Sequence, residues 1–187
     1  MDLRAPLQLS SMIKSMTDVV LPAIDPENQM AQEQAQLVVG MMHLMAMRLP
    51  MQFHYDLDEL RRYLGLSQAL IGACAGGALT KAEIQKLAAC VTDGEQALAG
   101  AQTAPAELEA ATLELRIRIS AFIDTLWRDG EPNCRQAASR AVLAASKEQI
   151  ERERAWFAPQ GWDADPSVCR SIEGLIDYPH RIDKSNT

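Results

Sequence analysis

The chain has few aromatic residues and no excess of basic ones. Only 5% of its 187 residues are Phe, Trp or Tyr, so its core must be built from aliphatic side chains. Ala and Leu favour helices, whereas sheets prefer β-branched and aromatic residues. The 25 acidic and 18 basic residues give a net charge of −7. Because nucleic-acid binding needs a basic surface that neutralises phosphates, this charge argues against a nucleic-acid partner.

Long apolar segments are also missing. The longest uncharged apolar runs cover residues 37–47 and 69–79, and both are short of the roughly 20 residues that a membrane-spanning helix needs. Residues 1–6 lack the basic region followed by a hydrophobic stretch that marks a secretory signal. We therefore expect a cytoplasmic protein that does not enter a membrane.

Common catalytic and metal-binding motifs are absent from the sequence. There is no Glu-x-x-His pair of a di-iron bundle, no Gly-x-Ser-x-Gly elbow, and no Lys-Ser/Thr pair after the glycine-rich segment 72–77. We predict no catalytic residue, no metal site and no cofactor. The cysteines are widely spaced and form no Cys-x-x-Cys pair, so we expect buried free thiols in a reducing cytosol. They are Cys74, Cys90, Cys134 and Cys169.

Methionine, in contrast, is concentrated at one end of the chain. All nine methionines lie within the first 51 residues, and six of them lie between Met30 and Met51. Methionine is unbranched and polarizable, so it suits both irregular cores and adaptable binding surfaces. This distribution predicts a buried central helix or a seam that faces a partner.

Apolar residues recur with helical periodicity along nearly the whole chain, and no sustained alternation predicts a strand. The pattern predicts an all-α helical bundle of about six helices plus a short C-terminal helix, joined by short turns. We expect one domain over residues 1–178 and a flexible tail over 179–187. The expected helices cover approximately residues 7–23, 25–49, 51–74, 81–99, 105–128, 133–157 and 165–178.

Local signals give more detailed expectations for some of these helices. Asp25 followed by Pro26 is typical of an N-cap and first helical residue, and Thr80 with Glu83 resembles a capping box. Gly65 is a potential break in the third helix. In the fifth helix, a buried stripe is expected at Leu108, Leu115, Ile119, Phe122 and Leu126, widened by Leu113, Ile117 and Ile123. In the second helix, the expected inner face consists of Met30, Leu37, Met41, Leu44, Met45 and Arg48.

The segment Val19-Val20-Leu21-Pro22-Ala23-Ile24-Asp25, followed by an Ala- and Gln-rich helix ending in Met47-Arg48-Leu49, resembles the opening of a small all-helical bacterial family of unknown function. Members are typically encoded beside aminoglycoside-phosphotransferase-like kinases and acyl-CoA dehydrogenases. The resemblance covers about residues 9–66. It implies an accessory role beside an acyl-CoA or phosphotransfer enzyme, and it implies no catalytic residues.

A few polar residues are candidates for a ligand site. His43 lies in an apolar segment, where it is either a metal or haem ligand or a hydrogen-bonded histidine at a helix edge. His54 and Asp58 are four residues apart and could share a metal or a proton, although acidic residues are common in a first helical turn. Cys74 has no evident histidine partner for nucleophilic chemistry. The candidates to test are His43, His54, Asp58, Arg61 and Cys74.

These observations favour a non-enzymatic accessory or protein-interaction module that self-associates. A homodimer is the commonest oligomer of soluble proteins. The alternative is a helical-bundle enzyme that binds a small molecule or a metal. The predicted dimer seam is formed either by Leu37, Met41, Leu44 and Met45 or by Leu115, Ile119 and Phe122.

Overall fold

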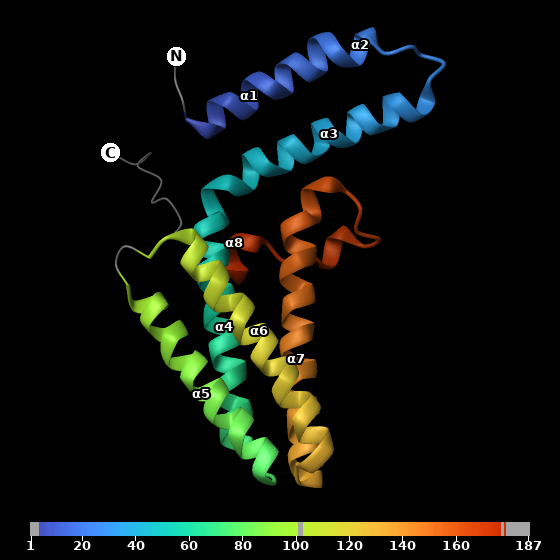
Figure 1. Cartoon of the computed structure of the whole chain (residues 1–187). Helices are drawn as coiled ribbons and strands as arrows, with labels where there is room; N and C mark the ends of the chain where they lie inside the picture. The colour runs from blue at the N-terminus through green and yellow to red at the C-terminus, as the bar shows by residue number, and fades with distance from the viewer. Residues whose placement is uncertain (1–3, 101–102, 177, 179–187) are drawn as a thin grey trace, which may run out of the picture. The chain divides into compact units, whose positions relative to one another are not determined.

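The structure, a computed structural model, describes residues 4–100, 103–176 and 178. It confirms the expected all-α class, with six long helical segments and a short C-terminal helix (Figure 1). No strand occurs in these ranges, where a single bridge joins Gly76 to Gly130. The α-helices are α1 (Ala5–Ser15), α2 (Leu21–Ala23), α3 (Gln29–Arg48), α4 (Gln52–Ala73), α5 (Ala78–Ala99), α6 (Pro105–Asp129), α7 (Pro132–Phe157) and α8 (Ile172–Leu175).

The chain divides into two compact units. Unit 1 comprises Met1–Gln52 and Glu153–Ile172, and unit 2 comprises Phe53–Arg152 and Glu173–Thr187. The boundaries between them fall within α4, α7 and α8. Because two compact units can belong to one folding domain, a single domain over residues 1–178 stays a prediction. The predicted tail, residues 179–187, lies outside the described residues.

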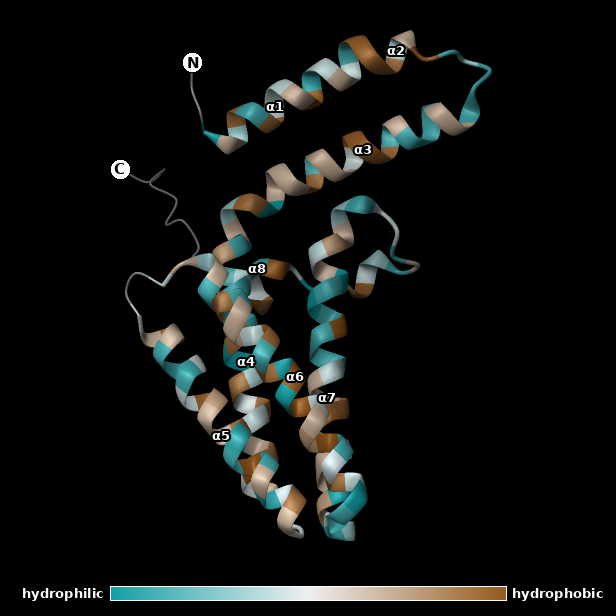
Figure 2. Cartoon of the chain, in the orientation of Figure 1, coloured by the Kyte–Doolittle hydropathy of each residue, from teal (hydrophilic) through white to brown (hydrophobic). Residues whose placement is uncertain are grey.

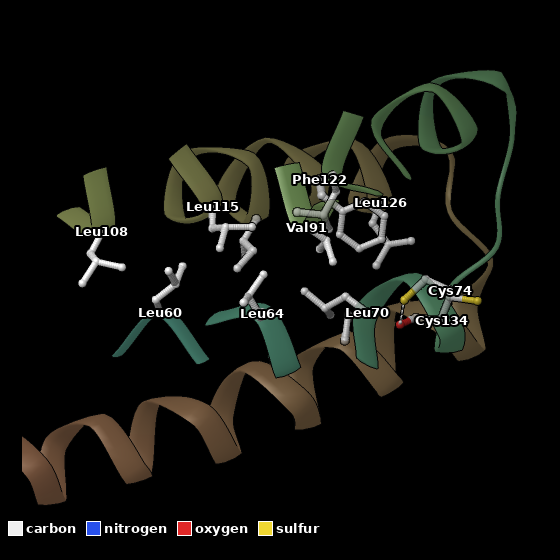
Figure 3. Close-up of a cluster of buried hydrophobic side chains, with 13 residues drawn as sticks. Leu60, Leu64, Leu70, Cys74, Val91, Leu108, Leu115, Phe122, Leu126 and Cys134 are labelled. Carbon is white, nitrogen blue, oxygen red and sulfur yellow. Dashed lines mark hydrogen bonds between the residues drawn. The ribbon is translucent and has the colours of Figure 1, made fainter. Parts of the chain in front are cut away.

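Unit 2 has a leucine-rich core. Its α5 and α6 pack along each other. The main predicted stripe of α6 is buried, which confirms the helical spacing of its apolar residues, but its expected widening is wrong at Leu113 and Ile117, which are exposed. The core is almost wholly aliphatic, with Phe122 as its one large ring, as the scarcity of aromatic residues requires (Figure 3). Its main side chains are Leu60, Leu64, Leu70, Leu87, Val91, Leu108, Leu115, Ile119, Phe122 and Leu126.

The N-terminus of α5 is capped by a residue from another helix. The carboxylate of Asp129, at the end of α6, accepts hydrogen bonds from the N–H groups of Leu79 (3.0 Å) and Thr80 (3.1 Å) and from the Thr80 hydroxyl. Thr80 therefore lies inside the first turn of α5, and the predicted capping box is wrong. Glu83 instead forms an ion pair with Lys86 at 2.6 Å.

In unit 1, the segment from Ala5 to Ala23 is helical throughout, as expected, but it widens into a π-helical turn at Met16–Val20. There the N–H of Leu21 donates to the carbonyl of Met16, five residues back. The wider turn directly precedes Pro22, whose ring would clash with a carbonyl four residues back in a regular α-helix. The segment ends just after this turn and packs along α3.

Helix α3 begins later than the sequence suggests. Its N-cap is Asn28, whose side-chain oxygen accepts from the N–H of Ala31 at 3.1 Å. The predicted cap, Asp25, accepts from the N–H of Glu27 in the preceding turn. At its other end, Arg48 is buried and donates to the carbonyl oxygens of Ala155 (3.0 Å) and Trp156 (2.9 Å), in the last turn of α7.

Two further expectations require correction. Gly65 does not interrupt α4, which is continuous from Gln52 to Ala73. The region expected to form a helix over 165–178 contains a 3₁₀ turn at Pro166–Val168 and the short α8. Asp165 caps the 3₁₀ turn, because its side chain accepts a hydrogen bond from the N–H of Ser167, but this turn ends at Val168 and does not continue as a helix. None of the described helices combines the length and apolar character needed to cross a membrane.

Candidate functional site

One face of α3 carries an exposed row of apolar side chains. We call Met30, Gln34, Leu37, Met41 and Met45 the α3 seam, because their spacing of three and four residues places them on one side of the helix. All five are exposed, and the exposed fractions of Met30 and Met45 are 75% and 55%. The α3 seam is therefore a continuous apolar stripe with a single amide in it.

The predicted inner face of this helix is largely wrong. Leu44 and Arg48 are buried as expected, but Met30, Leu37, Met41 and Met45 are exposed. The other buried residues of α3 are Ala35 and Met42, seven residues apart on a different face. Helix α3 packs along α1 and also contacts the 3₁₀ turn at Ala158–Gln160, and the α3 seam stays exposed in this arrangement.

Helix α1 is also poorly covered. None of its residues is buried, and Leu9 and Ile13 are only half-buried. Figure 2 shows apolar residues along both α1 and α3. The hairpin formed by these two helices therefore holds more apolar surface than it can bury by itself. Its exposed large apolar side chains outside the α3 seam include Leu7, Met12, Val19, Val20 and Val38.

Helix α3 carries little charge. From Gln29 to Met47 the sole charged residue is Glu33, and the α3 seam has none. In a chain with a net charge of −7, an uncharged face lets a second copy approach without like charges meeting across it.

The second predicted seam is in the core. Leu115, Ile119 and Phe122 are buried in the core of unit 2, where Figure 3 shows Leu115 and Phe122. Leu44, from the first seam, is buried as well. Of the predicted interface residues, those accessible to a partner in this structure are Leu37, Met41 and Met45.

A cluster of charged side chains in unit 2 includes one predicted ligand residue. The Asp58 carboxylate lies 2.7 Å from Arg62 Nε and 3.0 Å from Arg152 Nε. Arg152 is 1% exposed. Its guanidinium lies over the Tyr55 ring, with 4.3 Å between the guanidinium carbon and the ring centroid, and donates to the Tyr55 carbonyl oxygen. Arg62 also donates to Glu148 at 2.7 Å.

This cluster links residues of α4, α7 and α8 through ion pairs and a hydrogen bond, and none of these contacts indicates a reaction. Two arginines are balanced by Asp58 and Glu148, and Arg62 also donates to the carbonyl oxygen of Leu175 in α8. The Asp58 carboxylate is thus already engaged by cations of the chain. The sequence pointed to Asp58 but missed Arg62 and Arg152. The four-residue spacing of Asp58 and Arg62 was a usable signal, whereas Arg152 is far away in the sequence.

The other predicted ligand residues are distributed over both units. His54 makes edge contacts with the rings of Phe53 and Tyr178, at centroid distances of 6.2 and 5.1 Å. Arg61 is exposed on α4, and His43 is exposed on α3 in unit 1. Within the described ranges, no group of three or more His, Cys, Asp or Glu side chains could hold a metal ion.

Cys74, the remaining candidate, lies at the end of α4 beside another thiol. Its Sγ donates to the carbonyl oxygen of Cys134 at 3.7 Å. Burial, followed by the proximity of Cys134, raises the pKa of Cys74. A raised pKa disfavours Cys74 as an isolated nucleophile.

Comparison with protein families, with curated proteins and with solved structures finds no match for this chain.

Proposed function

We propose that this protein is a non-enzymatic, cytoplasmic interaction module that self-associates as a homodimer through the α3 seam. The observation that carries this proposal is the exposed, uncharged row of apolar side chains on a hairpin whose other helix has no buried residue. An amphipathic helix gains most of its stability by burying its apolar face. A second copy supplies such a cover.

The geometry suits two hairpins packed together. Two helices have too little surface to enclose a core, whereas four helices enclose one through seams spaced three and four residues apart. In a two-fold symmetric dimer, each side chain near the axis meets its own copy. Apolar residues tolerate this arrangement better than charged ones, and the single amide, Gln34, can both donate and accept a hydrogen bond.

An accessory role is a further part of the proposal. The resemblance of residues 9–66 to a bacterial family supports an acyl-CoA or phosphotransfer enzyme as a second partner. The alternative of a ligand-binding enzyme gains no support from the Asp58 cluster, because its carboxylates are engaged by Arg62 and Arg152.

Native mass spectrometry and analytical ultracentrifugation of the full chain test self-association. We expect a wild-type dimer, and we expect the double variant Met41→Glu with Met45→Glu to raise the dissociation constant by at least about 100-fold, because two charges on each copy would have to be desolvated. Circular dichroism of this variant should retain the helical signal, because both side chains are exposed.

A matched control places the same charges elsewhere. Leu143 and Ile150 are exposed on α7, in the part of the helix that belongs to unit 2, and their double substitution by Glu should leave the dimer intact. A wild-type chain that stays monomeric at ~100 μM, well above the dissociation constants of typical stable dimers, would contradict the proposal. So would a seam variant that dimerises as strongly as the wild type.

A further inference from the structure

Two buried thiols lie together at one end of unit 2. Cys74 follows the last residue of α4 and Cys134 lies in the first turn of α7. They are 60 residues apart in sequence, yet Figure 3 shows them side by side at the edge of the leucine core. Their exposed fractions are 8% and 7%. Neither belongs to the surface proposed for self-association.

The backbone holds this arrangement in place. The N–H of Gly77 donates to the carbonyl oxygen of Asp129 (3.0 Å), and the N–H of Glu131 donates to that of Ala75 (3.1 Å). Gly76 and Gly130 form the bridge between these segments. A side-chain carbon on Gly76 would lie 2.9 Å from the Cα of Gly130, so the close approach requires glycine.

The contacts at the sulfur atoms give the two cysteines different roles. Cys134 Sγ accepts a hydrogen bond from the N–H of Ala75 at 3.0 Å. It also lies in the first turn of α7, so a backbone donor and a helix N-terminus are both placed at this residue. Cys74 Sγ instead donates to the carbonyl oxygen of Cys134. Cys134 is therefore the better nucleophile, and Cys74 is the thiol beside it.

Each sulfur lies close to the backbone beside the other cysteine. The nitrogen atom that donates to Cys134 Sγ belongs to Ala75, the residue covalently attached to Cys74. The Cys134 sulfur is thus 3.0 Å from an atom only two covalent bonds from the Cys74 Cα. Formation of a disulfide then requires the two side chains to turn their sulfur atoms toward each other.

We propose that Cys74 and Cys134 form a dithiol site that a hydroperoxide oxidises to an intramolecular disulfide. The Cys134 thiolate attacks one peroxide oxygen, which becomes the hydroxyl of a sulfenic acid, while the other oxygen leaves as water or an alcohol after protonation. The Cys74 thiol then attacks the sulfenic sulfur, an S–S bond forms, and water leaves. The two thiols lose two electrons, and the peroxide gains them.

The other two cysteines serve as internal references. Cys90 and Cys169 are more exposed than the pair. Burial raises the pKa of Cys90, and burial together with a hydrogen bond to Asp163 raises the pKa of Cys169. Neither is recorded beside a second thiol that could capture a sulfenic acid. If exposure decided the order of oxidation, Cys90 and Cys169 would react first, whereas pairing predicts that Cys74 and Cys134 react first.

The test titrates the native full chain with hydrogen peroxide, denatures it, alkylates the remaining thiols and maps the peptides. We expect Cys74 and Cys134 to be lost first and together, as one linked peptide lighter by two hydrogens. First loss of Cys90 or Cys169, with Cys74 and Cys134 still alkylated, would overturn the proposal. So would oxidation of Cys134 to a sulfinic acid without any linked peptide.

Two single variants test the order of the steps. In Cys74→Ser, oxidation of Cys134 should stop at a sulfenic acid that a 1,3-dione traps. In Cys134→Ser, Cys74 should stay reduced at the same peroxide concentration. A trapped sulfenic acid on Cys74 in the second variant would overturn the assigned roles. Circular dichroism checks the fold of each variant, and the wild-type experiment needs neither of them.

Discussion

Asp58 and Glu148 carry the same formal charge but lie in different surroundings. Asp58 is largely buried and lies beside Arg62 and the fully buried Arg152, whereas Glu148 is exposed and meets Arg62 alone. A buried arginine loses its hydration, so removal of its counter-charge leaves a buried cation without its ion-pair partner. An exposed pair remains hydrated and is worth little.

We therefore expect Asp58→Asn to lower the free energy of unfolding by about 3 kcal/mol. Glu148→Gln, which removes one charge from the same cluster, should lower it by at most about 1 kcal/mol. Urea denaturation followed by far-UV circular dichroism measures both values. Equal losses in the two variants would show that the burial of Arg152 has no energetic consequence.

At the scale of elements, the helix ends depend on residues that are distant in sequence. The first turn of α5 donates its N–H groups to Asp129 at the end of α6. The Thr80 hydroxyl and then these N–H groups hold the pKa of Asp129 below its ordinary value. The ionised carboxylate is thus the form that caps the helix.

Asp129→Ala should open the first turn of α5, because a helix start without an acceptor frays. We expect amide hydrogen exchange at Leu79 and Thr80 to accelerate by about tenfold or more, a typical effect of losing a cap. Asp124→Ala removes an exposed acid from the same α6 and should leave these amides unchanged. Unaltered exchange at Leu79 in the Asp129 variant would exclude the capping role.

The spacing of apolar residues was enough to predict the helices and the buried stripe of α6, because Leu115, Ile119 and Phe122 repeat with the helical period and are covered by their own unit. It was not enough for α3. Met30 and Met41 repeat just as regularly, and periodicity identifies an apolar face without identifying what covers it. The pairs Asp58–Arg152 and Cys74–Cys134 could not be predicted from the spacing either, because the two residues of each pair belong to separate segments that meet only through tertiary packing.

At the scale of the whole molecule, the two compact units are connected through helices. The boundaries fall within α4, α7 and α8, so unfolding of one unit would have to break hydrogen-bonded turns that belong to the other. Helix formation is cooperative. This continuity supports one unfolding transition for the chain, as the predicted single domain over residues 1–178 requires.

Tryptophan fluorescence can test this prediction, because Trp127 lies in unit 2 while Trp156 and Trp162 lie in unit 1. A Trp127→Phe variant leaves the fluorescence of unit 1, and a Trp156→Phe, Trp162→Phe variant leaves that of unit 2. In each variant, we expect the urea midpoint measured by fluorescence to coincide with the midpoint measured by circular dichroism. Coincident probes are the signature of a two-state transition. Two separate midpoints would instead establish two domains.

The methionines of the α3 seam also bear on how selective such a surface can be. An exposed methionine samples many rotamers, and freezing one costs up to about 2 kcal/mol of side-chain entropy. Part of the free energy gained by covering Met30, Met41 and Met45 would therefore be offset by lost side-chain freedom. The same freedom lets these side chains adapt to neighbours of different shape, so recognition at the seam would depend more on apolar character than on an exact fit.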